Sequence, residues 1–367
     1  MKKLQRERRK IFLIVFGLSL FGLLMIYEAS SIYAWRLTGD SAYFFKRQLV
    51  YFILGLIAFF SVLAVDLEFL RRKSALLLAV NLIFLALVLI IGRQVGGARR
   101  WLSLGGFSIQ PSEFLKISFL LYCVDYLCRK GGALRNFHRG MLPLLVVGGV
   151  SACLILLAPD LGTVIFWLGW LFLMLFIANA RKKHLMFLVL AGLIGGGVLV
   201  KLYPYRVQRL TSYLNPWADP HGSGFQLIQS QIAYGSGGIT GVGLGASNQK
   251  FLFLPAAHTD FVFSIVAEEF GFLGAIGMIG IFFFLFHTMF TLSFRITKPF
   301  QRMLCVGIAL VMGLEIAVNI GVTCGLFPTK GLSLPFLSYG GSNLIVHYLL
   351  LGILFKSTKT DENIISH

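Results

Sequence analysis

The sequence predicts an all-α polytopic membrane protein with ten transmembrane helices. Hydrophobic residues make up 57% of the 367 residues, and the mean hydropathy is +0.81. Charged residues make up only 13%, about half the fraction of an ordinary soluble protein. Long apolar runs recur along the whole chain, without the alternation of apolar and polar residues that barrel strands require. Helices are therefore the predicted spanning elements.

Ten apolar stretches come close to the length of about 20 residues that crosses a bilayer as a helix. The eighth is longer than a span requires, so we expect it to tilt or bend. The fourth and the tenth are short. The stretches are residues 11–33, 48–66, 74–92, 111–128, 141–159, 162–180, 185–203, 261–293, 303–326 and 341–355.

The distribution of lysine and arginine sets the predicted orientation. With ten spans, the two terminal segments and the connections after spans two, four, six and eight fall on one side, and they hold 21 of the 33 basic residues. Basic residues mark the cytoplasmic side, so both termini are expected there. The net charge of +18 is spread over these short segments rather than gathered on one domain. No nucleic-acid partner is therefore predicted.

A long polar stretch separates the seventh and eighth spans. We expect it to form one large extracytoplasmic loop, residues 204–259, within a single transmembrane domain that covers residues 1–367. Long ordered loops are uncommon in compact proteins and are usually functional. The loop contains no cysteine, and no Cys/His spacing in the chain is typical of zinc, so neither a disulfide framework nor a metal site is predicted.

Twelve basic residues fall on the predicted outer side or near the outer ends of spans. Insertion disfavours basic residues in short outer loops, so an anionic ligand at the outer membrane face would explain why some are retained. Contact with lipid headgroups or local ion pairs would explain the others. The twelve are Arg36, Lys46, Arg47, Arg93, Arg99, Arg100, Lys116, Lys201, Arg206, Arg209, Lys250 and Lys330.

The segment before the fourth span carries the first candidate site residues. Arg99 and Arg100 are candidates for anion binding, whereas Trp101 alone is more typical of an interfacial anchor. Glu113 lies in the first turn of the span, where an acid commonly complements the helix dipole. Lys116 lies one turn further, inside the span, and can pair with Glu113. An ionisable residue inside a membrane is a site hypothesis by default.

Two further groups of polar residues have simpler interpretations. Asp160 lies at the sharp turn between spans five and six, where it suits a helix N-cap. Glu315, Asn319 and Thr323 recur every four residues on the ninth span. They are expected to face the bundle interior and to form hydrogen bonds across helices.

The long loop supplies more candidates for binding an anionic ligand. Arg206 and Arg209 lie three residues apart, and arginine suits bidentate phosphate capture. Residues 225–238 are predicted to form a short amphipathic helix, with Gln226 among the polar groups turned toward a sugar or headgroup. This loop therefore predicts a polar surface for an anionic ligand.

Asp260 closes the loop at the mouth of the eighth span. Thr259 and Asp260 would form an acceptable N-cap for that helix. The acid also lies at a boundary between water and membrane, close in sequence to Lys250 and His258. A carboxylate there could deprotonate a bound hydroxyl. Both interpretations stay open on the residues alone.

The connection between the ninth and tenth spans, residues 324–344, is rich in proline and glycine. A sharply turned or re-entrant segment of this kind is tolerated only where it is buried or lines a cavity. Lys330 lies in it, and Ser338 belongs to a run that offers backbone amides and hydroxyl groups. A rigid turn that packs the bundle is the alternative.

Four segments taken together resemble the SEDS family (shape, elongation, division and sporulation). They are residues 98–116, 209–238, 254–271 and 328–344, which occur in the family's order around ten spans and one large outer loop. The chain is more similar to the cell-division member than to the elongation or sporulation members. Residues 256–261 depart slightly from the family pattern, because no acidic residue precedes the histidine, but the acid itself is present.

The resemblance implies a peptidoglycan glycosyltransferase, and the family's essential aspartate falls on Asp260. Such an enzyme polymerises lipid II at the outer face of the bacterial cytoplasmic membrane, here for septal synthesis in cell division. Transfer would invert the sugar configuration, with undecaprenyl diphosphate as leaving group and Asp260 as general base. A class B penicillin-binding protein and other divisome membrane proteins are the implied partners. The residues expected to bind substrate are Arg99, Arg100, Trp101, Glu113, Lys116, Arg206, Arg209, Gln226, Lys250, His258, Lys330 and Ser338.

The leaving diphosphate needs positive charge, which arginines, lysines or a divalent cation (Mg²⁺ or Mn²⁺) could supply. No sequence feature specifies a site for that cation, and no cofactor is predicted. Two alternative functions stay open at this point. One is a lipid II flippase that uses the same charged residues, and the other is a non-catalytic scaffold for a penicillin-binding protein.

Overall fold

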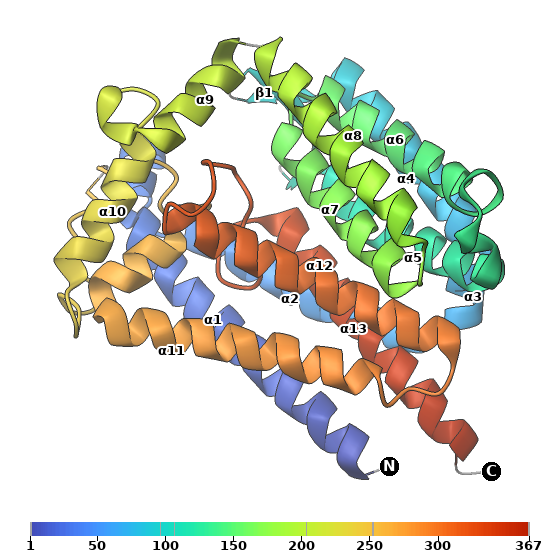
Figure 1. The fold of residues 1–367 in the computed structure, drawn as a ribbon. Coiled ribbons are helices and arrows are strands. Elements are labelled where there is room, and N and C mark those ends of the chain that lie inside the picture. The colour runs from blue at the N-terminus through green and yellow to red at the C-terminus, as the bar shows by residue number, and fades with distance from the viewer. Residues whose placement is uncertain (1, 96, 106, 203, 252, 366–367) are drawn as a thin grey trace.

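The computed structural model describes residues 2–95, 97–105, 107–202, 204–251 and 253–365, which fold into a helical bundle with one small sheet (Figure 1). The helices of the bundle are α1 (Lys2–Thr38), α2 (Tyr43–Ala64), α3 (Leu67–Arg72), α4 (Ser74–Ile91), α5 (Pro111–Lys130), α6 (Leu142–Leu157), α7 (Leu161–Ile177), α8 (Lys182–Lys201), α11 (Val262–Ser293), α12 (Pro299–Thr323) and α13 (Gly341–Ile365). Between α8 and α11 lie α9 (Pro204–Leu214) and α10 (Phe225–Gly237). The strands are β1 (Arg93–Val95), β2 (Ala98–Leu104) and β3 (Phe107–Ile109).

Within the described residues, seven helices are long and apolar enough to cross a membrane: α1, α2, α4, α6 with the turn before it, α8, α11 and α12. Helices α5, α7 and α13 cover the remaining apolar stretches of the sequence. Helix α7 has only 17 residues, and α5 carries buried charged side chains. The chain is therefore a multi-pass membrane protein with an α-helical fold.

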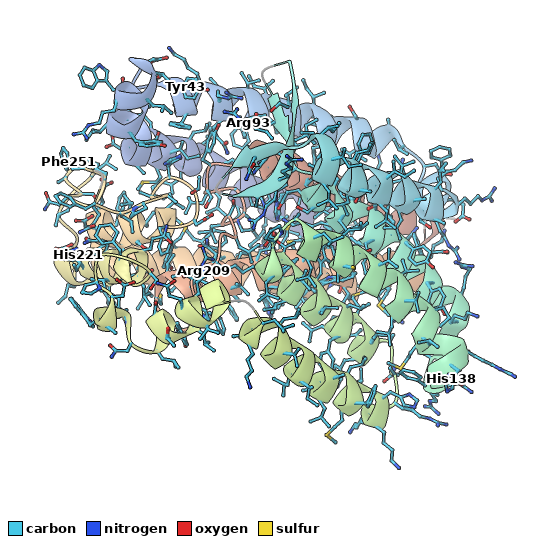
Figure 2. The ribbon with its side chains drawn as sticks, turned by 90° about the horizontal axis from the view of Figure 1, so that it is seen from above. Tyr43, Arg93, His138, Arg209, His221 and Phe251 are labelled. Carbon is cyan, nitrogen blue, oxygen red and sulfur yellow. The ribbon has the colours of Figure 1, made fainter. Side chains whose placement is uncertain are left out.

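The ends of the bundle differ in what they carry. The start of α1 and the end of α13 lie at the same end (Figure 1). His221 and Phe251, from the stretch between α8 and α11, lie at the end opposite His138 (Figure 2). We call the end with α9, α10 and the sheet the loop end. Helix α8 is the least enclosed candidate span, because only 6% of its most apolar 18-residue stretch is buried inside the protein.

The small sheet was not predicted from the sequence. Strands β1, β2 and β3 pair antiparallel in chain order and lead into α5. Two glycines with positive φ permit its turns, Gly97 at +78° and Gly105 at +53°. Both strand pairs are local, so they need only short hairpin connections. The sheet departs from the all-α prediction only outside the spans.

Helix α11 bends at Gly271, as the excess length of the eighth span predicted. Gly271 has φ +66° and ψ −165°, a backbone conformation essentially restricted to glycine. Residues 238–243 of the long loop lie against this break. The amides of Phe272 and Leu273 donate to the carbonyls of Gly238 and Ile239 at 2.9 and 3.1 Å. The backbone groups that the helix loses at the kink are thus satisfied by the loop.

One turn earlier in α11 the donors and acceptors are reversed, because loop amides donate to helix carbonyls. The amides of Val242 and Gly243 donate to the carbonyls of Glu268 and Glu269, both at 3.0 Å. The wholly buried Glu268 carboxylate also accepts from the backbone amides of Asn248 and Gln249. The loop is therefore joined to α11 by backbone and side-chain hydrogen bonds just before the residues that lead to Asp260.

We predict that Gly271→Ala destabilises the protein by roughly 1–3 kcal/mol, because alanine disfavours this φ/ψ pair and its methyl group would collide with the backbone of Gly241. The measurement is the thermal unfolding midpoint in detergent, together with protease cleavage within residues 238–250. Gly277→Ala on the same helix is the matched control, because a Cβ there meets nothing within 4 Å. Equal midpoints for the two variants would contradict the proposed constraint.

Candidate active site

Asp260 is not the N-cap of the eighth span, so that interpretation was wrong. Helix α11 begins at Val262, and its N-cap is Phe261, with no side-chain capping bond. The Thr259 hydroxyl donates to the carbonyl of Ala256 at 3.1 Å instead. A turn around Ala256 (φ +57°) carries the aspartate to the start of the helix. Its half-buried carboxyl group is therefore not used to end a helix.

Asn319 of α12 fixes the backbone of Asp260 and of a second segment together. Its side-chain amide donates to the carbonyl of Asp260 at 2.9 Å and to that of Leu332 at 2.5 Å. Residues 329–332 consequently lie against the aspartate. A Cβ at Gly331 would stand 2.9 Å from Asp260 Oδ2, so a larger residue there would displace the carboxyl group from its present position.

Lys330 extends from the same segment toward the start of α7. Its ammonium group donates to the carbonyl of Gly162 and lies 5.7 Å from the centre of the Phe166 ring. Asp160 is the N-cap of α7, as predicted, because its carboxylate accepts from the amide of Thr163 at 3.1 Å. A carboxylate and an ammonium group therefore meet at the N-terminus of α7.

Arg100 binds the turn between α6 and α7 from the side of β2. Its guanidinium donates to the carbonyl of Ala158 at 2.9 Å and to that of Pro159, and it lies 3.6 Å from Asp160 Oδ2. Carbonyl groups at the end of a helix have no partner within the helix. Arg100 supplies donors to those at the end of α6 and so ties β2 to the turn between α6 and α7.

Two groups of the site titrate near neutral pH. Burial, reinforced by the negative charge of Asp160, raises the pKa of Asp260 to about 7, and the positive charge of Arg209 opposes this shift. Burial lowers the pKa of Lys330 to about 8, against the opposing charge of Asp160. Arg209 itself donates to the carbonyl of Thr329 at 3.4 Å. The site thus combines a weakly acidic carboxyl group with two cations held on residues 329–330.

A largely buried charge network joins three helices nearby. Lys116 of α5 is 1% exposed, and its ammonium lies 2.5 Å from Glu113 Oε2 and pairs with Glu315 of α12. The Asn343 amide of α13 donates to the same Glu113 oxygen at 2.9 Å. His347 Nε2 lies 2.6 Å from Glu315 Oε2. The prediction that Lys116 pairs with Glu113 is confirmed.

Two of the predicted residues before the fourth span lie apart from Asp260. Arg99 is exposed and donates to the carbonyl of Ile90 at 2.9 Å, near the end of α4. Trp101 is half-buried in β2, in register with Arg93 of β1. Neither contact brings these side chains to the segment 329–332.

Lys250 forms a separate ion pair group that joins the loop to two helices. Its ammonium donates to Glu28 of α1 at 3.1 Å and lies 3.7 Å from Glu269 of α11. Gln226 lies half-buried in the first turn of α10, which covers the predicted amphipathic helix. Arg206 is in α9, but its side chain lies outside the described residues.

His258 and Ser338 belong to the packing around the site. The His258 ring lies 4.6 Å from that of Phe44 and 5.7 Å from that of Tyr339, and burial lowers its pKa to about 4. Ser338 is buried, and its hydroxyl accepts from the amide of Leu334 at 2.9 Å. The His258 ring therefore packs between α2 and the last connection, and the Ser338 hydroxyl fixes a turn within that connection.

Sequence reasoning missed part of this arrangement. Asp160 was interpreted as a cap alone, although its charge also acts on Asp260 and Lys330. His347 was not singled out, although an ionisable residue within a span was a sufficient reason to do so. The backbone of Gly331 carried no sequence signal, because its role depends on a contact between distant segments.

Acidic and metal-ligating side chains are sparse at the site. Over the part of the chain that the structure describes, no group of three or more His, Cys, Asp or Glu side chains converges to hold a metal ion. Asp160 and Asp260 are the two carboxyl groups that act on each other electrostatically here. Mg²⁺ commonly binds through one or two carboxylates together with substrate phosphates, and this pair has that chemistry.

Comparison with known proteins places the chain in one family. The family model described as "Cell cycle protein" (FTSW_RODA_SPOVE) matches residues 8–363. A probable peptidoglycan glycosyltransferase FtsW of Trichlorobacter lovleyi is 42% identical over 351 residues, covering 94% of this chain and 91% of the relative. Stage V sporulation protein E of Bacillus subtilis is also 42% identical, over 340 residues that cover 92% of this chain and 93% of the relative.

Solved structures agree with this placement. A chain from the structure described as "Structural coordination of polymerization and crosslinking by a peptidoglycan synthase complex" is similar with a TM-score of 0.80 and 31% identity. The match covers 96% of this chain and 97% of that one. The rod shape determining protein RodA of Thermus thermophilus is similar with a TM-score of 0.71 and 28% identity, covering 96% of each chain.

We predict that Lys116→Met lowers the free energy of unfolding by about 3–5 kcal/mol, because it leaves the carboxylates of Glu113 and Glu315 buried without their ammonium partner. Chemical or thermal unfolding in detergent measures the change. Lys46→Met is the matched control, because the Lys46–Asp40 pair is similarly short at 2.8 Å but its lysine is 66% exposed. That control should change stability by less than about 1 kcal/mol. Similar losses for both variants would refute the energetic role of burial.

Proposed function

The chain belongs to the cell cycle protein family named for FtsW, RodA and SpoVE, and we propose that it polymerises peptidoglycan strands with Asp260 as general base. The enzyme is a glycosyltransferase, in keeping with its relatives named probable peptidoglycan glycosyltransferase FtsW. The observation that carries the assignment of the base is the position of Asp260, a half-buried residue whose carboxyl group lies beside the backbone of Gly331. Burial raises its pKa to about 7, which suits proton transfer near neutral pH.

The proposed reaction is an inverting transfer between two lipid-linked sugars. A hydroxyl group of the acceptor attacks the anomeric carbon of the donor, and Asp260 takes the hydroxyl proton. The bond to the donor's diphosphate breaks, and undecaprenyl diphosphate leaves with the electron pair. The close approach of Gly331 supports this role, because it leaves space beside the carboxyl group that a Cβ would fill.

Positive charge for the leaving diphosphate comes from the segment beside Asp260. Lys330 and Arg209 are the proposed groups, because both are held on residues 329–330 and both are linked electrostatically to the acids of the site. Arg100 is a weaker candidate than its sequence suggested, since its donors already serve carbonyls at the end of α6. We assign it a positioning role.

A divalent cation would fit with the substrate. Asp160 and Asp260 could contribute carboxylate oxygens, and the diphosphate would supply the remaining charged ligands. Such an ion would neutralise charge on the leaving group. The residues Lys330 and Arg209 supply part of this charge from the chain itself.

The membrane arrangement follows the charge distribution. We propose ten spans, with the loop end outside and both termini in the cytoplasm, because ten spans put the basic segments of the sequence on one side and the long loop on the other. Placement outside puts Asp260 where a flipped lipid-linked sugar is available. We further propose a class B penicillin-binding protein as partner, supported by the similarity to a synthase complex that coordinates polymerisation with crosslinking. Division and the septum are the proposed setting, supported by the FtsW relatives.

The alternatives receive less support. A lipid II flippase that used Lys116, Glu113 and Glu315 would need these charges open to a passing headgroup, yet the three side chains are 1%, 12% and 0% exposed. A non-catalytic scaffold would have no use for a carboxyl group poised near neutral pH. The enzyme therefore remains the proposal that the geometry favours.

We predict that Asp260→Asn reduces the rate of lipid II polymerisation by about 10²–10⁴-fold, because the amide cannot accept the hydroxyl proton. Gel analysis of glycan strands from labelled lipid II, made by the purified full chain with its partner, measures the rate. An unchanged unfolding midpoint shows that the fold is retained. Asp40→Asn, an exposed acid paired with Lys46, is the control and should keep wild-type activity. Full activity of Asp260→Asn would refute Asp260 as the base, whereas no polymerisation by the wild-type chain would favour the scaffold or flippase instead.

The pH dependence of the rate should be bell-shaped, with limbs near about pH 7 and about pH 8. Asp260 has a raised pKa, so it is protonated and inactive as a base below about 7. Lys330 has a lowered pKa, so it loses its positive charge above about 8. Initial rates between about pH 5.5 and about pH 9.5 test both limbs. Lys330→Arg should remove the alkaline limb, because arginine stays charged. An unchanged alkaline limb in that variant would contradict the role of Lys330.

A further inference from the structure

The ring nitrogens of His347 both face oxygen atoms. Nδ1 lies 2.7 Å from the backbone carbonyl oxygen of Asn343, and Nε2 lies 2.6 Å from Oε2 of Glu315. Both contacts are too short for an intervening water, and His347 and Glu315 are both 0% exposed. A carbonyl oxygen only accepts hydrogen bonds, and therefore Nδ1 must carry a hydrogen.

The second nitrogen then requires one more hydrogen. A neutral imidazole with its hydrogen on Nδ1 presents a lone pair at Nε2, and an ionised Glu315 would oppose it with another lone pair at 2.6 Å. The contact becomes a hydrogen bond in two ways. Either Nε2 is also protonated and donates to the carboxylate, or the carboxyl group is protonated and donates to Nε2. Both arrangements hold one proton more than a neutral histidine beside a carboxylate.

The charges around the pair lead to the same conclusion. The titratable groups that face it in the described part of the chain are Glu113 and Lys116 of α5, and the charge of Lys330 acts on this network from the last connection. The ring of Phe336 also packs on that of His347, with the ring centres 5.5 Å apart. Glu113 and Lys116 neutralise each other, and the charge of Asp160 offsets that of Lys330. An ionised Glu315 beside neutral histidine would therefore leave one buried negative charge. A buried charge without a partner is strongly unfavourable.

We propose that Glu315 and His347 form a buried proton-binding site that holds one extra proton and keeps the Lys116 network electrically neutral. His347 is then a positioning residue. With the proton bound, Glu315 orients Lys116 without imposing a net negative charge beneath a site that receives an anionic diphosphate. Loss of the proton to solvent would place that charge there.

The direct test locates the proton in the full chain, in detergent or nanodiscs at neutral pH. Nitrogen-15 NMR of labelled histidine reports the protonation of the His347 ring, with His347→Gln used to assign its signal. Infrared difference spectra against Glu315→Gln report a protonated carboxyl group. Two protonated ring nitrogens, or one together with a carboxylic acid band from Glu315, are the expected results. A ring with one protonated nitrogen and no such band would overturn the proposal.

His287→Gln is the matched control for these spectra. His287 also lies in a membrane helix, α11, but it is exposed and stacks on Phe283. Its removal should leave the His347 signal and the carboxyl band unchanged. A change in either feature would show that the assignment to the buried pair is wrong.

A second measurement detects the extra proton from the pH dependence of the unfolding constant. Glu315→Gln is nearly isosteric, and its amide can donate to Nε2 of a neutral His347, so this variant needs no extra proton. Above the ordinary histidine pKa of about 6.5, unfolding of the wild type releases one proton more than unfolding of the variant. The wild-type unfolding constant should therefore rise about tenfold per pH unit relative to that of Glu315→Gln. Parallel pH profiles for the two proteins would refute the extra proton.

Discussion

The constraint on which the structure depends is that a charge inside a membrane must be paired. Lys116 is almost fully buried, so its ammonium group needs the carboxylates of Glu113 and Glu315. This requirement fixes the rotation of α12 relative to α5. Once Glu315 faces inward, Asn319 and Thr323 must face the same way, because residues four apart share one face of a helix. The pairing of one lysine thereby orients the whole polar stripe of α12.

Asn319 and Thr323 of that stripe hold different parts of the loop end. Asn319 donates to the carbonyls of Asp260 and Leu332, which sets the catalytic candidate beside the last connection. Thr323 lies 3.0 Å from the hydroxyl of Tyr234, which belongs to α10 of the long loop. The loop is joined a second time at the kink of α11, where its backbone replaces the missing helical hydrogen bonds. The long loop is consequently an integral part of the bundle, with Asp260 fixed from both sides.

Local features of this protein could be read from the sequence, and contacts between distant segments could not. The helices of the spans, the α11 bend, the Asp160 cap and the pairing of Lys116 with Glu113 depend on neighbours within a few residues or on hydropathy. The small sheet was missed because its strands are short and its glycine turns lie between two spans. The role of Asp260 as N-cap was wrong because a turn around Ala256 delays the start of the helix. The partner of His347 lies on another helix, and nothing in the tenth span alone identifies it.

The degree of burial separates the charges that build this protein from those that can react. Lys116 forms ion pairs with Glu113 and Glu315 in a closed network. These pairs stabilise the charged side chains and orient the helices that carry them. Asp260 and Lys330 are only half-buried, and their pKa values of about 7 and about 8 leave both able to change protonation near neutral pH. A base must be desolvated enough to be reactive yet open enough to meet a hydroxyl group. The closed network holds the helices rigidly, and this rigidity maintains the intermediate burial of Asp260 and Lys330.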